Sequence, residues 1–227
     1  MLVDDELEFL AGLLPLDGIE VIELGCGAAQ FARQLLRRYP GSRVTGLEID
    51  ARQHAKNLTD PQPGLQFHSG VAEAIPFADA GFDLALMLKS LHHVPEAAMP
   101  RALLEVARVL RPGGHLYVSE PVFAGAFNEV VRLFNDEQRV RAAAQATIDA
   151  ALADGATWQQ VAEHRFDMPV RFADFAEFEQ RLMRPTFAEH DIDDAKLVEV
   201  RRAFEPHLGP DGARFERPMH VRLLRRR

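Results

Sequence analysis

Short, mostly apolar runs alternate with stretches of helical periodicity along the first half of the chain. Such runs, bounded by turn residues, are typical of strands that are buried on both faces. They occupy residues 21–24, 43–50, 65–68, 82–88 and 115–120. Between them, apolar residues recur at the spacing of one helix face, as in Leu103, Val106 and Leu110. This alternation predicts an α/β fold in which a mostly parallel, doubly wound sheet carries helices on both faces.

The pattern changes after Pro121. Alanine-rich residues 127–153 predict one or two helices that lie over the carboxyl edge of the sheet. The remaining expected elements are a strand within 161–172, helices at 175–183 and 194–204, and a closing strand at 219–224. Because no linker interrupts the chain, we expect residues 1–227 to form a single domain, with 121–190 as a helical insertion that covers the substrate.

The bulk composition narrows the kind of partner and compartment. The formal net charge of −8 disfavours nucleic acid, whose phosphates favour a basic face. One cysteine excludes an internal disulfide, and the histidines show no His-Glu-x-x-His spacing, so no metal site is expected. No run reaches the ~18 apolar residues of a membrane span, and the N-terminus is acidic where a signal peptide is basic. We therefore expect a cytoplasmic protein without a membrane partner, and the sequence indicates no particular oligomeric state.

The strongest candidate for chemistry is the turn that follows the first predicted strand. Gly25 and Gly27 allow a sharp bend and a close approach of the backbone to a ligand. The next helix, marked by Phe31 and Leu35, directs its free N–H groups toward the turn, where they favour a carboxylate or a phosphate. Glu23, two residues before the first glycine, would repel a pyrophosphate and attract an ammonium. The stretch therefore favours a cofactor that carries an amino-acid group over a dinucleotide.

Five segments, taken in order, carry a family resemblance. They are residues 23–29 (ELGCGAA), 44–48 (VTGLE), 72–77 (AEAIPF), 82–84 with 91–94 (FDL and LHHV) and 108–114 (RVLRPGG). Together they resemble the class I S-adenosylmethionine-dependent methyltransferases, in particular their small-molecule branch, over residues 20–121. The resemblance implies a Rossmann-like sheet of seven strands, S-adenosylmethionine as cofactor, and methyl transfer to a small-molecule acceptor by in-line displacement.

The resemblance also implies a cofactor site across the carboxyl ends of the first and fourth strands. Glu48 would accept hydrogen bonds from both ribose hydroxyls, and Glu23 would face the ammonium of the methionine group. The main-chain carbonyls of Leu88 and Lys89 would bind the same ammonium. The full set is Glu23, Gly25, Cys26, Gly27, Glu48, Ile49, Val71, Ala72, Glu73, Leu88 and Lys89. The alternative for Glu48 is a solvated surface acid, and Asp50 is expected to cap the next helix.

Two positions depart from the family pattern. Ala29 replaces the third glycine of the turn, which the backbone can absorb if φ is negative there. Val71 stands where the family commonly has an aspartate that binds the adenine amino group. We expect that bond to be absent, or to come from Glu73 or a main-chain carbonyl, with the N–H of Ala72 reaching a ring nitrogen. Three apolar side chains would sandwich the base: Leu47, Ile49 and Ile75.

The candidate catalytic groups follow the fourth and fifth strands and are His93, His92 and Glu120. Methyl transfer needs an aligned nucleophile in a dry pocket, and it needs a base only when the acceptor is a hydroxyl, a thiol or an acidic carbon. One histidine of the pair would then take the proton. The alternatives are that the two histidines shape the following loop and that Glu120 is a buried acid paired with backbone N–H groups.

Two other functions fit parts of the pattern. A nicotinamide-dependent oxidoreductase also has glycines after a strand, but Gln30 stands where its final glycine is expected and Glu23 is an acid beside the phosphate site. A non-catalytic S-adenosylmethionine-binding protein is the second alternative, and only the departure at Val71 favours it. Residues 121–190, which would surround the acceptor, contain no motif that identifies its chemical class.

Overall fold

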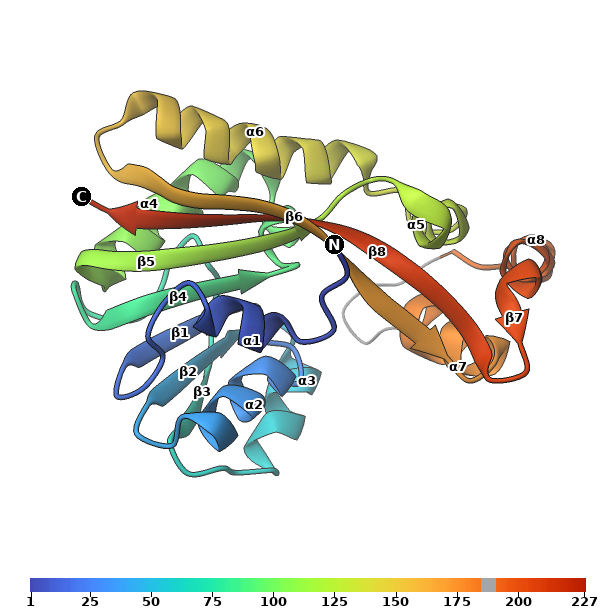
Figure 1. The fold of residues 1–227 in the computed structure, drawn as a ribbon, viewed down its shortest axis with the longest axis horizontal. Coiled ribbons are helices and arrows are strands. Elements are labelled where there is room, and N and C mark those ends of the chain that lie inside the picture. The colour runs from blue at the N-terminus through green and yellow to red at the C-terminus, as the bar shows by residue number, and fades with distance from the viewer. Residues whose placement is uncertain (185–190) are drawn as a thin grey trace.

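The computed structural model describes residues 1–184 and 191–227, and its centre is one twisted β-sheet (Figure 1). Seven strands follow one another in the order β3-β2-β1-β4-β5-β8-β6, and a short eighth strand, β7, pairs with β8. β1 to β5 are parallel, whereas β8 is antiparallel to both β5 and β6. The strands are β1 (Glu20–Leu24), β2 (Arg43–Glu48), β3 (Leu65–Ser69), β4 (Phe82–Leu88), β5 (Leu110–Pro121), β6 (Trp158–Phe172), β7 (Leu208–Gly209) and β8 (Gly212–Arg226). The predicted doubly wound, mostly parallel α/β sheet is confirmed.

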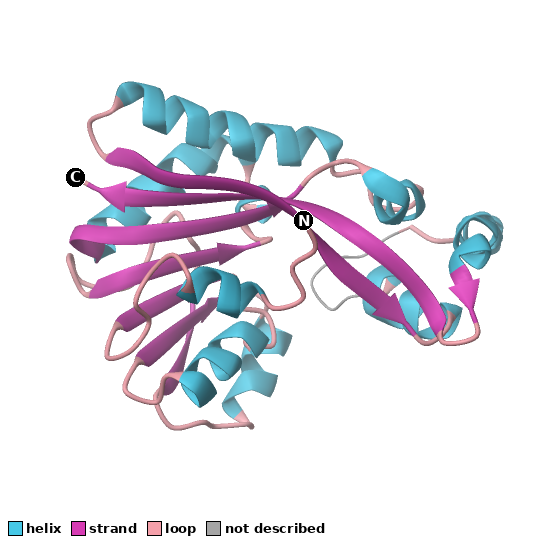
Figure 2. Ribbon diagram, in the orientation of Figure 1, coloured by secondary structure: helices cyan, strands magenta, loops and turns pink. Residues whose placement is uncertain are grey.

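Helices cover both faces of this sheet (Figures 1 and 2). The helices of one face are α1 (Glu6–Ala11), α2 (Gln30–Arg38) and α3 (Ala51–Leu58), and those of the other are α4 (Met99–Val109) and α6 (Gln138–Asp154). Successive residues of a strand point to opposite faces. Leu84 and Leu86 of β4 therefore belong to the core under α1 and α2, while Ala85 and Met87 belong to the core under α4 and α6. Burial on both faces explains why residues 82–88 are apolar almost throughout.

The last two long strands leave the sheet together (Figure 1). β6 and β8 pair from Trp158 with Arg226 to Phe172 with Ala213, and their far half is a two-stranded ribbon beyond the sheet. Around it lie α5 (Gly125–Val131), α7 (Phe175–Phe178), a π-helical turn η3 (Glu179–Met183) and α8 (Asp194–Phe204). We call these helices and the far half of the ribbon, residues 167–172 and 212–218, the distal unit. Its own core contains six phenylalanines: Phe127, Phe172, Phe175, Phe178, Phe204 and Phe215.

The structure differs from the predicted elements in three places. β5 begins at Leu110 rather than at His115, because residues 111–114 form a bulge with Gly113 at φ +80° and stay within the strand. β8 begins at Gly212, well before the predicted start at 219, because its first half pairs with β6 outside the main sheet. The insertion expected over 121–190 is only partly helical, since it contains β6, and its residues 185–190 lie outside the described part.

Three short helices complete the chain: η1 (Leu91–His93), η2 (Glu96–Ala98) and η4 (Glu205–His207). Within the described ranges, every helix is too short or too polar to cross a membrane.

Candidate functional site

A cleft of about 1110 Å³ opens at the carboxyl ends of β1, β2 and β4. Its wall includes all the residues predicted to bind the cofactor, and it includes His93. Residues that the sequence analysis did not select also line it, from the N-terminal segment 4–7 and from the second half of the chain. Those of the second half are Asn135, Glu137, Met168 and Arg181. The fold thus brings both halves of the chain to one site.

The glycine turn after β1 forms the floor of this cleft. Gly25 has φ +70° and Gly27 has φ +52°, a left-handed conformation that costs glycine little. A Cβ atom on Gly25 would lie 2.9 Å from Cβ of Ser90, so only glycine lets the turn pack against the loop after β4. A Cβ atom on Gly27 would meet nothing within 4 Å. The first glycine therefore permits close packing, and the second leaves free space beside the backbone.

Ala29 contradicts one expectation, because its φ is +54° rather than negative. Ala29 is the residue before α2, and its N–H donates to the carbonyl of Cys26 at 2.8 Å, which closes the turn in the left-handed conformation. That conformation costs a non-glycine residue roughly 1–2 kcal/mol. The methyl group is fully buried, and burying it returns about 0.8 kcal/mol. Alanine is thus tolerated here because burial offsets much of the backbone strain.

Glu48 ends β2 and holds the glycine turn in place. Its Oε2 accepts a hydrogen bond from the Gly27 N–H at 2.7 Å, and its Oε1 accepts one from the Asp50 N–H at 2.8 Å. The side chain is 6% exposed, so it is not a solvated surface acid. Each carboxylate oxygen can accept a second hydrogen bond, so Glu48 can still bind hydroxyl groups from the cleft. Asp50 caps α3 as predicted, accepting from the Arg52 N–H at 2.9 Å.

Glu23 lies at the carboxyl end of β1 and is 4% exposed. Among the described residues, nothing donates a hydrogen bond to its Oε2. Burial raises the pKa of Glu23 to about 8, against an opposing effect of the Lys89 charge. A buried carboxyl with an unsatisfied oxygen on the wall of a cleft is a candidate ligand-binding group. An ammonium brought by a ligand would satisfy it.

Lys89 follows β4 with φ +58°, an uncommon conformation for a residue other than glycine. Its N–H donates to the Ser119 carbonyl at 2.7 Å, which fixes the strand end. Its Nζ lies 3.7 Å from Oε2 of Glu6, whose Oε1 accepts from the Tyr117 hydroxyl at 3.3 Å. Glu6 is buried, and the sequence alone does not reveal this because the residue reads as an ordinary acid in the first turn of a helix.

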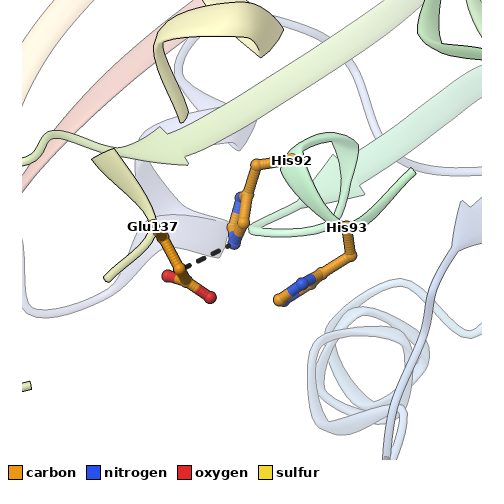
Figure 3. Close-up of side chains that lie close together, drawn as sticks. All are labelled: His92, His93 and Glu137. Carbon is orange, nitrogen blue, oxygen red and sulfur yellow. Dashed lines mark ion pairs between the residues drawn. The ribbon is translucent and has the colours of Figure 1, made fainter. Parts of the chain in front are cut away.

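Figure 3 shows His92 and His93 side by side, with Glu137 next to His92. His92 is buried, whereas His93 lines the cleft. The buried His92 bonds through Nδ1 to the Glu120 carboxylate, whose Oε1 also accepts from the Leu91 N–H at 2.9 Å. His93 faces the cleft, and its ring lies 4.1 Å from the ring of His92. Desolvation, followed by the proximity of His92, lowers the pKa of His93.

Glu120 therefore does not contact the acceptor. It is 1% exposed and does not line the cleft, which corrects its assignment as a group that would act on the acceptor directly. The structure supports the alternative interpretation, a buried acid bonded to a backbone N–H group. Glu120 can influence chemistry only by positioning His92.

Glu137 joins the histidine pair in space, 44 residues after His93 in the chain, and no local spacing signals it. Its Oε2 lies 3.8 Å from Nε2 of His92 and accepts from Arg141 at 2.6 Å, while Asn135 donates to its Oε1 at 3.0 Å. The ligand atoms of His92, His93 and Glu137 lie within 4.8 Å of one another. A tetrahedral zinc ion needs such atoms about 3.3 Å apart. Arg141 already donates to the Glu137 carboxylate at 2.6 Å. The absence of a metal at this cluster stays a prediction.

The region predicted for adenine contains fewer ready contacts than expected. Ile49 stands on the cleft wall and is 67% exposed, whereas Ile75 is 4% exposed and belongs to the core rather than to the wall. The carbonyl of Glu73 already accepts from Arg101 at 2.9 Å, and that of Val71 accepts from the Ala74 N–H at 3.3 Å. The proposed contact of Ile75 with the base is therefore wrong, while Ile49 remains a predicted contact.

Comparisons with known proteins agree with this geometry. Residues 22–118 match the family model described as a methyltransferase domain. The chain is 38% identical over 102 residues to a phthiotriol/phenolphthiotriol dimycocerosates methyltransferase of Mycobacterium leprae, a match that covers 44% of this chain and 37% of that protein. It is 36% identical over 111 residues to a fatty-acid O-methyltransferase of Mycolicibacterium smegmatis, covering 46% of this chain and 38% of that protein.

Solved structures match along nearly the whole chain. The YcgJ protein from Bacillus subtilis superposes with a TM-score of 0.66 at 17% identity, and the match covers 97% of each chain. At this identity the likeness shows a shared fold. The chain spans little more than a third of the length of the two curated relatives, 37% and 38%.

Proposed function

We propose that the chain transfers a methyl group from S-adenosylmethionine to a small-molecule acceptor, and the match of residues 22–118 to the methyltransferase-domain model supports this proposal. The main support for the proposal is that the buried Glu23 carboxyl on the cleft wall has an oxygen to which no described residue donates a hydrogen bond. The ammonium of S-adenosylmethionine matches this group. The phosphates of a nicotinamide dinucleotide would be repelled by it once it ionises.

The residues that would hold the cofactor fit its chemistry. Gly25 and Gly27 leave the turn open to the methionine group, and Glu48 keeps free lone pairs for the ribose hydroxyls. The strand end at Leu88 and Lys89 would supply carbonyl oxygens to the ammonium. A cleft of about 1110 Å³ has room for the cofactor and a small acceptor together. The two curated relatives are named for lipid and fatty-acid methylation, which also supports a small-molecule acceptor.

The chain's own contribution to the reaction is orientation and proton handling. When bound, S-adenosylmethionine supplies an electrophilic methyl group on a positively charged sulfur. Leu7, Val94 and Met168 give the cleft apolar walls that exclude water from the acceptor. His93, kept neutral at neutral pH by its lowered pKa, would accept the proton of a hydroxyl acceptor. His92, fixed by Glu120, would hold the neighbouring ring in position.

Binding of S-adenosylhomocysteine, the demethylated product, is expected to strengthen as the pH rises. In the free protein Glu23 is protonated below pH 8 or so, and the ligand's ammonium favours its ionised form. Binding therefore releases a proton, and affinity should increase by up to about tenfold per pH unit between about pH 6.5 and 7.5 and level off above the pKa. Isothermal titration calorimetry in buffers of different ionisation enthalpy measures both the affinity and the proton release.

The Glu23→Gln variant is the control for this prediction, because glutamine keeps the size of the side chain and cannot titrate. Its affinity should be independent of pH over the same range, with no proton released. Equal pH slopes in the wild type and in Glu23→Gln would assign the effect to another group and contradict the proposed role of Glu23.

The two alternative functions are separated by binding and turnover. Calorimetric titration with S-adenosylmethionine and with NADH should show binding of the first and none of the second. Release of S-adenosylhomocysteine in the presence of any small-molecule acceptor identifies an enzyme. Cofactor binding without turnover across a broad panel of acceptors would instead indicate a non-catalytic binding protein.

A further inference from the structure

Arg217 is a cation in the distal unit, beside the cleft residue Met168, and it has no ion pair among the described residues. It lies in β8 opposite Met168 of β6, and Met168 lines the cleft. Residues opposite each other in an antiparallel pair project to the same side of the sheet, so Arg217 projects to the side of Met168. Its guanidinium carbon lies 4.6 Å from the centroid of the Phe127 ring. Within residues 1–184 and 191–227, the half-buried guanidinium has no hydrogen bond or ion pair with the protein.

The charged groups around Arg217 leave a local excess of positive charge. Desolvation first, and then the nearby cations Arg141 and Arg181, lower the pKa of Arg217 to about 10, while Glu137 and Glu6 oppose this effect. Arg217 therefore stays charged at neutral pH. Glu137 is already bound to Arg141 at 2.6 Å, so it is not available to neutralise a second guanidinium.

The second arginine at this end of the cleft is held in place. Arg181 lines the cleft, donates to Glu177 at 2.8 Å, and lies over the Phe172 ring at 4.8 Å. It is thus a fixed cation whose charge is already shared with a carboxylate. Arg217 differs because none of its N–H donors has a hydrogen-bond partner in the described part of the chain. Removing a guanidinium from water without a partner is unfavourable, so such a group is expected where a ligand supplies the anion.

We propose that Arg217, assisted by the charge of Arg181, binds a carboxylate of the methyl acceptor, so that the acceptor is a small carboxylic acid. This inference rests on the proposed methyltransferase function and names its substrate class. The planar fork of a guanidinium matches the two oxygens of a carboxylate. The apolar neighbours Phe127 and Met168 suit the hydrocarbon body of such an acid better than a polar head group with several phosphate oxygens.

The test is calorimetric binding of matched acids and amides to the protein saturated with S-adenosylhomocysteine. The probes are octanoate with octanamide and phenylacetate with phenylacetamide, together with phenyl phosphate. In the wild type each acid should bind at least about tenfold more tightly than its amide, as expected for a hydrogen-bonded charge pair. In Arg217→Met this preference should disappear, and in Arg217→Lys it should be partly retained.

Arg214→Met is the matched control, because Arg214 lies on the same strand, is exposed, and pairs only loosely with Asp211 at 3.4 Å. It should bind the acids as the wild type does. All variants should bind S-adenosylhomocysteine with unchanged affinity. If the wild type does not bind S-adenosylhomocysteine, the proposed function itself is contradicted. This outcome differs from failure of the acid site, in which S-adenosylhomocysteine binds and the acids show no preference over the amides.

Three results would overturn the assignment of the acid site. The first is equal affinity of the wild type for acids and amides, including the absence of binding by either. The second is an acid preference that survives in Arg217→Met. The third is tighter binding of phenyl phosphate than of phenylacetate, which would assign the site to phosphate esters. Thermal unfolding gives a separate readout, because Arg217→Met should melt at a higher temperature than the wild type once the unpaired charge is removed.

Discussion

Replacing Glu48 by alanine is expected to weaken binding of S-adenosylhomocysteine about 100-fold. Two ribose hydroxyls lose a charged acceptor, and hydrogen bonds of this kind contribute roughly 1.5–3 kcal/mol each, so a loss of about 3 kcal/mol is a conservative sum. The backbone N–H groups of Gly27 and Asp50 lose their acceptor as well. The free energy of unfolding should therefore fall by roughly 1–3 kcal/mol. Calorimetry measures the first effect and urea denaturation the second.

Two companion variants separate ribose binding from support of the turn. Glu48→Gln keeps an oxygen that can accept from Gly27, and we expect it to weaken binding about tenfold with little loss of stability. Asp50→Asn removes the neighbouring charge and keeps a good helix cap, so its affinity should equal that of the wild type. If Asp50→Asn weakens binding as much as Glu48→Gln does, Asp50 rather than Glu48 binds the ribose hydroxyls.

Substituting His93 by alanine is expected to lower turnover about 100-fold for acceptors methylated at a hydroxyl, while the affinity for S-adenosylhomocysteine stays unchanged. His93 lies on the cleft wall, and its lowered pKa keeps the imidazole neutral and able to accept a proton at neutral pH. In the wild type, activity should fall as the pH is lowered through a value below the ordinary 6.5 of histidine, because the protonated ring cannot act as a base. The rate at which S-adenosylhomocysteine forms from S-adenosylmethionine, with phenols or hydroxy acids as acceptors and between about pH 5 and 8, gives this profile.

His115→Ala is the matched control for His93. His115 also has a pKa lowered by desolvation, but it pairs with Leu84 in the first half of β5 and does not line the cleft. Its substitution should leave unchanged both the turnover and the fall in activity as the pH is lowered. If His93→Ala retains the wild-type rate at saturating acceptor, the histidine pair only shapes the loop after β4.

The sequence was informative where one residue type satisfies a local requirement. Residues 82–88 are apolar because both faces of β4 are buried, so the strand could be identified without its partners. Asp50 caps α3 through its own side chain, which is a contact within a few residues. Glu23 and Gly25 mark the turn for the same reason, because strand, bend and acid are adjacent in the chain. The floor of the cleft was therefore predictable.

The rest of the cleft depends on contacts between distant segments, which no local pattern encodes. Glu6 of α1 and Glu137, the residue before α6, line the cleft, and Arg217 of β8 lies opposite the cleft residue Met168. Each of the three reads alone as an ordinary surface charge. The left-handed φ of Ala29 could not be predicted because alanine disfavours that conformation. Burial of its methyl group, which depends on the rest of the fold, offsets part of the cost. The start of β8 was missed because residues 212–218 pair outside the sheet, where one side of the ribbon is polar.

The unbroken course of β6 and β8 from the central sheet into the distal unit separates two tasks within one fold (Figure 1). The floor that would receive the methyl donor is built from β1, β2 and β4, whereas the cation at Arg217 belongs to the outer part of the β6–β8 ribbon. Exchanging the distal unit for that of a related chain should alter which acceptor is methylated and leave donor affinity intact. Such a result would mean that acceptor preference can change without any change in the donor site.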